Sequence, residues 1–329
     1  MMTFFSHVAI CLLALFALPS WAQQMDEAVL EKSQGILSLR SGAKVRYFSN
    51  AAELANPRRA IIMVHGVLRN SERYFLDTRA AAYASGEGDQ TLVIALAFDN
   101  EDTRPKELNE LAIFDGNWKL GSRESMFGSS SFLVMDDMLQ DVLKRYPSIN
   151  KISLAGHSAG GQFIGRYAVL NDVHEYMQQT ELRYFVMAPS SHLYLREERP
   201  QFVGGVLQHG FAIPEDDCGG EYNTYPYGLK MQGSEVEVPM PSLNPQQLQA
   251  RFAKRRVFYA VGALDIETDY LDESCAAMKQ GVNRLERMEY YFRSLGPDSL
   301  QNHSMIVLSG VPHDANIMMH HAAMQALLF

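Results

Sequence analysis

A serine flanked by glycines two positions to either side gives the clearest chemical signal in the sequence. It lies in Gly156-His157-Ser158-Ala159-Gly160, between an apolar segment at 151–155 and a segment of helical spacing at 161–170. Strand, sharp turn and helix is the setting in which a G-x-S-x-G pattern exposes a serine oxygen at the carboxyl end of a strand. The N–H groups of the adjoining helix N-terminus favour developing negative charge there. We therefore expect Ser158 to be a nucleophile.

A serine hydroxyl also needs a base within hydrogen-bond reach and an acid that orients the base. The candidate acid is Asp265, which follows the apolar strand expected at 256–261. Gly262 lets the chain turn directly after that strand, so the carboxylate should stand at the carboxyl edge of the sheet. Glu267 and Asp269 lie in the same loop and compete for the role, because a loop can bring either one inward.

The candidate base is His313, which directly follows the last expected strand, 304–308. Its rivals are His303, His320 and His321. His303 precedes the same strand and should therefore lie at the opposite edge of the sheet. The other two should lie well inside the last helix, away from the catalytic edge.

The oxyanion of a tetrahedral intermediate needs two backbone N–H donors. The N–H of Ala159, directly after the nucleophile, is the first expected donor. The second should come from the loop after the strand at 59–64, where Val67 is the expected donor and Leu68 the alternative.

Two histidines adjoin these loops without an expected catalytic role. His65 begins the loop that carries Val67 and is expected to hold that loop in place. His157 is too near Ser158 in the chain to approach it as a base. We expect it to shape the turn or to border the substrate.

The elements that position these residues alternate between strand and helix. Apolar strands are expected at 59–64, 91–98, 151–155, 183–188, 256–261 and 304–308. Helices are expected at 71–85, 132–146, 161–170, 271–295 and 314–328. This alternation predicts an α/β fold with a largely parallel central sheet and helices on both faces.

One segment breaks the alternation. Residues 189–251 contain seven prolines and follow the strand that comes after the nucleophile's helix. Long insertions at such positions form lids or substrate walls. Four aromatic residues are expected either to line an acyl or aryl pocket or simply to pack this region: Trp118, Tyr222, Tyr225 and Tyr227.

The first 22 residues resemble a secretory signal peptide rather than part of the fold. An uncharged apolar run spans 8–18, and small residues precede a cleavage site after Ala22. The alternative is an uncleaved anchor helix, for which the run is short. We expect a secreted or periplasmic protein whose residues 23–329 form one domain.

Export changes the interpretation of the cysteines. The chain after the expected cleavage site retains two, Cys218 and Cys275. An even number in an oxidising compartment favours one disulfide, and two buried free thiols are the alternative.

Composition argues against several classes of partner. The net charge is −9 and the basic residues are scattered, so nucleic acid is not an expected partner. His320 and His321 lack the spacing of a zinc site such as H-E-x-x-H. After the leader, no segment is apolar and long enough to predict stable membrane insertion. Nothing in the pattern predicts an oligomeric state.

Taken together, these segments resemble the α/β-hydrolase superfamily. The resemblance rests on His65-Gly66, on the segment around Ser158, on Gly262-Ala263-Leu264-Asp265 and on Gly310-Val311-Pro312-His313. It covers about 58–329, with serine, acid and histidine in the superfamily's order. The segment that starts at His65 is also similar to that of secreted esterases and polyester depolymerases.

The resemblance implies the α/β-hydrolase fold and hydrolysis of a small or polymeric carboxylic ester through an acyl-enzyme, without a metal or organic cofactor. A peptidase or an acyltransferase with the same three residues is the alternative within this class. A non-catalytic binding module is the alternative outside it. Such modules usually lose a member of the triad, whereas this chain retains Ser158, Asp265 and His313.

Overall fold

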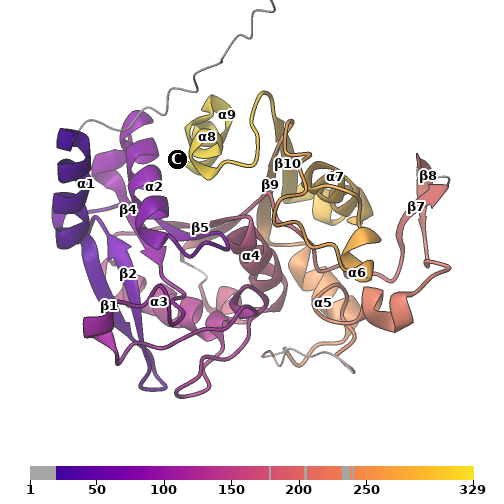
Figure 1. Cartoon of the computed structure of the whole chain (residues 1–329), viewed down its shortest axis with the longest axis horizontal. Coiled ribbons are helices and arrows are strands. Elements are labelled where there is room, and N and C mark those ends of the chain that lie inside the picture. Colours follow the sequence, from indigo (N-terminus) through magenta and orange to yellow (C-terminus); the bar gives the residue numbers. More distant parts are fainter. Residues whose placement is uncertain (1–19, 178, 204–205, 232–237, 239–240) are drawn as a thin grey trace, which may run out of the picture.

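An eight-stranded sheet forms the centre of the molecule (Figure 1). The structure, a computed structural model, describes residues 20–177, 179–203, 206–231, 238 and 241–329. In spatial order the strands are β1 (Gln34–Ser38), β2 (Lys44–Ser49), β4 (Thr91–Leu96), β3 (Arg59–Val64), β5 (Lys151–His157), β6 (Glu181–Met187), β9 (Arg256–Gly262) and β10 (His303–Leu308). β1 and β2 pair antiparallel with their neighbours, and all pairs from β4 to β10 are parallel. The mostly parallel sheet expected from the sequence is confirmed.

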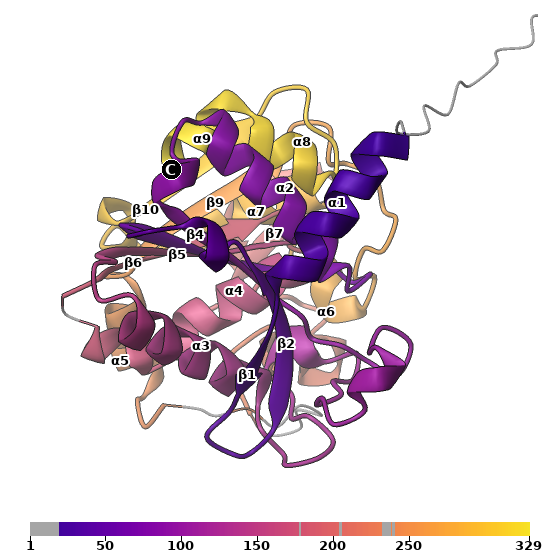
Figure 2. The same ribbon diagram turned by 90° about the vertical axis from the view of Figure 1, so that its left-hand side faces the viewer.

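Helices cover both faces of this sheet, and its central strands are therefore apolar throughout. Every residue of β4 is buried. One face carries α2 (Ser71–Ala84), α8 (Ala315–His320) and α9 (Ala322–Leu328); the other carries α3 (Ser131–Arg145), α4 (Ala159–Leu170) and α5 (Pro245–Phe252) (Figure 2). The remaining α-helices are α1 (Ser20–Ser33), α6 (Cys275–Met278) and α7 (Arg284–Ser294). Short 3-10 helices are η1 (Ala51–Glu53), η2 (Gly88–Gln90), η3 (Lys106–Leu108), η4 (Trp118–Leu120), η5 (Val173–Tyr176), η6 (Cys218–Asn223) and η7 (Ser299–Gln301).

Two expected helices are broken in the structure. The helix expected at 271–295 is replaced by α6 and α7, because Gly281 has φ 142° and Asn283 caps α7 by accepting a hydrogen bond from the Glu286 N–H. The helix expected at 314–328 is interrupted at His321, whose backbone is extended and whose side chain caps α9. Both expectations of one continuous helix are wrong.

The segment between β6 and β9 includes the expected insertion at 189–251. It contains β7 (Arg199–Val203) and β8 (Val206–Ala212), which pair as a separate antiparallel sheet. Figure 1 shows this hairpin at one side of the molecule, clear of the central sheet. η6 and α5 follow it before the chain returns to β9.

Buried arginines hold the irregular parts of this segment. Arg166 on α4 is 1% exposed, and its guanidinium donates to the carbonyls of Ser191 and Pro226 at 3.3 and 3.0 Å. Arg199 is equally buried and donates to the Tyr222 carbonyl. Buried backbone carbonyls outside regular structure need such partners. These guanidinium groups therefore fix the path of loops that lack a strand ladder.

A disulfide joins Cys218 at the start of η6 to Cys275 at the start of α6, with 5.8 Å between the two Cα atoms. This is the pairing that the sequence analysis favours. It connects the insertion to the stretch of chain that follows Asp265.

Replacing both cysteines by serine is expected to lower the free energy of unfolding by about 3–4 kcal/mol, because the unfolded chain regains the entropy of a long loop. Urea denaturation of the Cys218→Ser, Cys275→Ser double variant measures the loss. As a control, dithiothreitol should shift the midpoint of the native protein to that of the double variant and leave the double variant unchanged. Equal midpoints for both proteins without reductant would contradict the prediction.

The expected signal peptide falls largely outside the described residues. Residues 1–19 belong to that part, and Ser20–Ala22 begin α1. Within the part of the chain that the structure describes, none of the helices has both the length and the apolar character needed to cross a membrane.

Candidate active site

The backbone at Ser158 has the strained geometry that the sequence motif requires. Ser158 lies between β5 and α4 with φ 58° and ψ −115°, and its N–H donates to the Met187 carbonyl at 2.9 Å. A Cβ on Gly156 would come within 2.3 Å of the Gly160 oxygen, and one on Gly160 within 2.2 Å of the Val64 oxygen. Both glycines are therefore needed for the turn that presents the serine at the end of its strand.

Asp265 and His313 meet at the carboxyl edge of the sheet. The His313 Nδ1 lies 2.8 Å from the Asp265 Oδ2, which leaves Nε2 as the free ring nitrogen of this pair. Asp265 is fully buried, whereas the His313 side chain is 23% exposed. The loops approach closely because Gly262 has no side chain: a Cβ there would come within 2.0 Å of the Val311 oxygen.

The competing acids and bases lie in other surroundings. Glu267 and Asp269 are exposed. His303 is buried at the start of β10, where its Nε2 lies 3.1 Å from the Phe252 carbonyl oxygen. His320 is exposed at the end of α8, and its Nδ1 bonds to the Asn316 carbonyl. His321 caps α9. Only Asp265 and His313, among the candidates weighed from the sequence, bond to each other.

Arg284 is a component that the sequence analysis missed. Its guanidinium lies 3.6 Å from the Asp265 Oδ1, and both side chains are fully buried. It also donates to the carbonyls of Glu267 and Asp269, at 3.2 and 2.6 Å. Burial lowers the pKa of Arg284. This arginine supplies a counter-charge for the buried Asp265 and holds the loop that carries it.

Replacing Arg284 by methionine is expected to lower the free energy of unfolding by about 3 kcal/mol or more, because Asp265 would be left as an unpaired buried charge. Urea denaturation measures the loss. An Asp265→Asn, Arg284→Met double variant should lose less than the sum of the two single variants. Strict additivity would show that the two side chains do not interact.

The backbone donors expected for an oxyanion lie beside Ser158. Ala159 is the first residue of α4, so its N–H has no partner within the helix. Val67 follows β3, and its N–H donates to no backbone carbonyl among the described residues. Leu68, the alternative, is 65% exposed. The next residue, Arg69, holds this loop by donating to the carbonyl of Asp115 at 2.6 Å.

The two neighbouring histidines are buried and differ in surroundings. The His65 Nε2 accepts the Phe98 N–H at 3.0 Å, and burial lowers the pKa of His65 to about 4, so it holds the loop as a neutral ring. His157 lies with its ring centroid 4.5 Å from that of His313. The Tyr74 hydroxyl is 3.2 Å from the His157 Nδ1. Burial, and next the His313 charge, lower the pKa of His157 well below its usual value.

Two cavities meet at Ser158. The first, of about 590 Å³, is lined by His313, His157, Gly66 and Arg284 among others, and we name it the His313-side cavity. The second, of about 370 Å³, is lined by Lys119, Ala159, Gln162 and Tyr227 among others, and we name it the Lys119-side cavity. Ser158, Val67 and Tyr270 line both. A substrate bound at the serine can therefore extend in two directions.

The aromatic residues divide between core and cavity. Trp118 is 1% exposed and packs against His65, and the Tyr225 hydroxyl donates to the buried Leu120 carbonyl. Tyr222 is buried beside Arg199. Only Tyr227 of the four lines a cavity at Ser158. For the other three, packing was the correct alternative.

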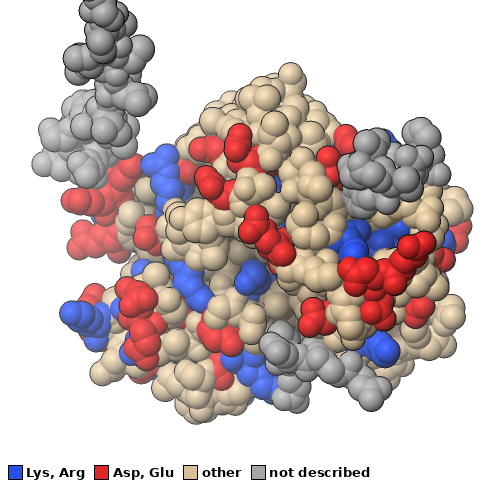
Figure 3. All heavy atoms as spheres, turned by 45° about the vertical axis from the view of Figure 1, so that its right-hand side comes forward, with Lys and Arg blue, Asp and Glu red and all other residues tan. Residues whose placement is uncertain are grey.

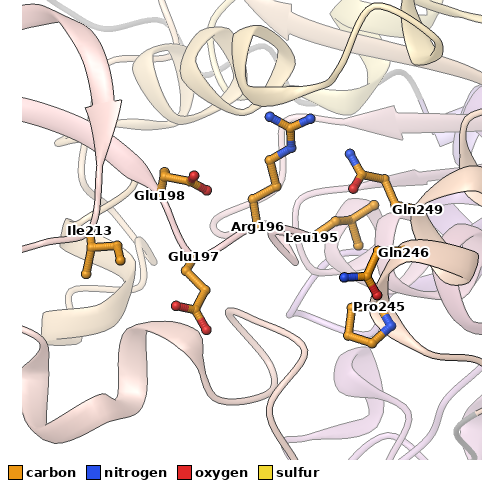
Figure 4. A pocket seen from close by; sticks show the side chains of 8 residues that line it. All are labelled: Leu195, Arg196, Glu197, Glu198, Ile213, Pro245, Gln246 and Gln249. Carbon is orange, nitrogen blue, oxygen red and sulfur yellow. The ribbon is translucent and has the colours of Figure 1, made fainter.

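A further cavity, of about 420 Å³, lies between the chain around 195–198 and α5, away from these residues. Figure 4 shows its charged members, Arg196, Glu197 and Glu198, spread around an open space rather than directed at one point. It contains neither Ser158 nor His313. We therefore locate the candidate active site at Ser158.

Sheet order, crossing helices and the serine turn after β5 together define the α/β-hydrolase fold. Two solved structures are similar over nearly the whole described chain. The poly(3-hydroxybutyrate) depolymerase LpqC from Bordetella parapertussis is 18% identical with a TM-score of 0.60, and the match covers 90% of this chain and 94% of that one. Poly(aspartic acid) hydrolase-1 from Sphingomonas sp. KT-1 is 18% identical with a TM-score of 0.58, covering 90% and 99%.

At this identity the similarity shows the fold. No protein-family model matches the sequence, and no curated protein does so either.

Proposed function

We propose that the protein is a serine hydrolase of carboxylic esters. Ser158 attacks the ester carbonyl while His313 accepts its proton, and Asp265 orients the imidazole and stabilises its charged form. The N–H groups of Ala159 and Val67 donate to the oxyanion. Collapse of the tetrahedral intermediate breaks the ester bond, and His313 returns the proton to the departing alcohol.

Water then completes the cycle. It gives a proton to His313, attacks the acyl-enzyme and forms a second tetrahedral intermediate. That intermediate releases the carboxylic acid and restores the serine hydroxyl. The observation that carries this proposal is the 2.8 Å contact between His313 and Asp265 at the cavity edge that also contains the strained Ser158.

The same proposal includes the organisation and location of the chain. Residues 23–329 form one domain, and the insertion at 189–251 supplies part of the substrate wall, since Ser190, Ser191 and Tyr227 line the Lys119-side cavity. Export to the periplasm or beyond, with cleavage after Ala22, agrees with the disulfide at Cys218.

A substrate panel tests the activity. Purified protein is assayed with p-nitrophenyl esters of increasing acyl length, beside polyester and peptide substrates. We expect release of alcohol from esters, together with labelling by a fluorophosphonate probe. Cleavage of peptides but not esters would replace the proposal with a peptidase, and absence of both turnover and labelling would leave a binding module.

A further inference from the structure

The two cavities at Ser158 differ in whether the proposed base, His313, lines them. The inference drawn from this difference rests on the proposed function. His313 lines the His313-side cavity but not the Lys119-side cavity. The base must protonate the departing alcohol, so the alcohol has to lie on the His313 side. The acyl group then extends in the other direction, past Ala159 and into the Lys119-side cavity.

The Lys119-side cavity is polar where an acyl chain would end. Its walls carry side chains that form hydrogen bonds: Asn117, Gln162, Ser190, Ser191 and Tyr227. It also contains one cation, Lys119, and one carboxylate, Asp272. A plain alkyl chain would bury these groups without replacing their contacts with water, which costs free energy. The walls therefore favour an acyl group that has its own polar end.

The Lys119 ammonium has hydrogen-bond donors that its contact with the protein does not use. Its ammonium donates to the Gly116 carbonyl at 2.8 Å, and within the described residues no carboxylate lies at salt-bridge distance from it. Asp272 makes no ion pair with it: the two carboxylate oxygens accept hydrogen bonds from the Tyr227 hydroxyl at 2.8 Å and from the Ser274 N–H at 3.1 Å, and the Asp272 charge acts on Lys119 only beyond salt-bridge distance. A lysine ammonium has three donors. Two of them therefore remain for a ligand.

Arg166 adds positive charge behind the same wall. It is buried, and its guanidinium bonds to carbonyl oxygens and to the Ser191 hydroxyl rather than to any carboxylate among the described residues. Burial, and next the charge of Arg166, lower the pKa of Lys119. The charges of Asp272 and Asp115 act in the opposite direction but do not outweigh these causes, so positive charge exceeds negative charge around Lys119. A bound anion would balance this charge.

We propose that the Lys119-side cavity binds an acyl group that ends in a carboxylate, and that Lys119 donates hydrogen bonds to that carboxylate. The preferred substrates are then half-esters of short dicarboxylic acids, in which one carboxyl is esterified and the other is free. Lys119 acts as a specificity-determining residue, since it contacts the far end of the acyl group and not the reacting carbonyl.

Matched substrates test the preference directly. Monomethyl succinate, glutarate and adipate are compared with the same methyl esters in which the free carboxyl is a carboxamide. For at least one chain length, kcat/KM of the native protein should favour the carboxylate by about 10- to 100-fold at low salt. This preference should fall as sodium chloride is raised. A carboxamide hydrolysed as well as the carboxylate at every chain length would overturn the proposal.

Three variants assign the preference to the residue. Lys119→Gln should reduce the ratio of the two kcat/KM values to near one, while Lys119→Arg should keep part of it. Lys254→Gln removes an exposed lysine elsewhere and should leave the ratio unchanged. A preference that survives Lys119→Gln would overturn the role of Lys119. If Lys119→Gln does not fold, the salt dependence in the native protein still decides whether a charged contact exists.

A binding measurement separates this inference from the proposed function. Calorimetric titration of the Ser158→Ala variant with monomethyl adipate and with its carboxamide reports recognition without turnover. Hydrolysis of neutral esters without preference for half-esters would overturn only the inference. If no ester is hydrolysed, the proposed function fails, and selective binding of the carboxylate would still support the anion-binding cavity, whereas equal or absent binding would overturn it.

Discussion

Replacing Ser158 by alanine is expected to lower kcat for ester hydrolysis on the order of 10⁶-fold, because removing the nucleophile of such a triad leaves only substrate binding and the oxyanion donors. The fold should persist, since Ser158 is held in the turn by its main chain: its N–H donates to the Met187 carbonyl, and its carbonyl accepts from the Gln162 N–H. Initial rates with the best p-nitrophenyl ester, together with circular dichroism, measure both expectations.

A matched variant controls for the loss of a serine elsewhere. Ser304 is exposed on β10, outside both cavities, so Ser304→Ala should retain full activity and full labelling by a fluorophosphonate. A Ser158→Ala protein that keeps a tenth of the native rate would remove Ser158 from the reaction.

Replacing His313 by alanine is expected to lower kcat for ester hydrolysis about as much as Ser158→Ala does, on the order of 10⁶-fold, because the serine proton then has no acceptor. Loss of the ring also removes the partner of Asp265, which stays buried beside Arg284. Rates measured across a range of ester concentrations should show the loss in kcat rather than in KM, since the missing group acts on the proton and not on substrate binding.

His320 offers a control on the same helical region. It is exposed, and its Nδ1 bonds to the Asn316 carbonyl of α8, so His320→Ala should keep native activity. An active His313→Ala beside an inactive His320→Ala would show that the base has been assigned to the wrong histidine.

Much of the fold could be predicted because parallel strands that are buried on both faces appear in the sequence as short apolar runs. The runs at 59–64, 151–155 and 256–261 correspond to β3, β5 and β9. Parallel strands share one carboxyl edge, so residues that follow them come together there. The contact between Asp265 and His313 follows from this rule, while their catalytic roles stay predictions.

The breaks in two helices could not be predicted from helical spacing. A single glycine such as Gly281 is compatible with a helical pattern, so the sequence does not predict a break there. In the structure its positive φ lies between the end of α6 and the start of α7. His321 carries no sequence signal that its backbone is extended. In both places capping side chains and tertiary packing outweigh the periodic pattern.

Buried arginines were also hidden from sequence reasoning. The scattered basic residues of the sequence do not indicate that Arg166, Arg199 and Arg284 are buried, because arginine is rarely fully buried. Only the folded chain shows which carbonyls they face. Charge on the face in Figure 3 remains intermixed, with acidic and basic side chains side by side. The absence of a nucleic-acid partner remains a prediction.

The arginine contacts have a consequence for engineering. Arg166, Arg199 and Arg287 bond mostly to main-chain oxygens, so they fix where the loops run and constrain few of the side chains on those loops, such as Ser191. Side chains in these loops can therefore be randomised, and the backbone should keep the same conformation. Arg199 holds the Tyr227 carbonyl, and Arg69 holds the loop of Asn117 at the Asp115 carbonyl. A library restricted to Asn117 and Tyr227 would therefore change one wall of the Lys119-side cavity, and selectivity could be redesigned there without rebuilding the loops.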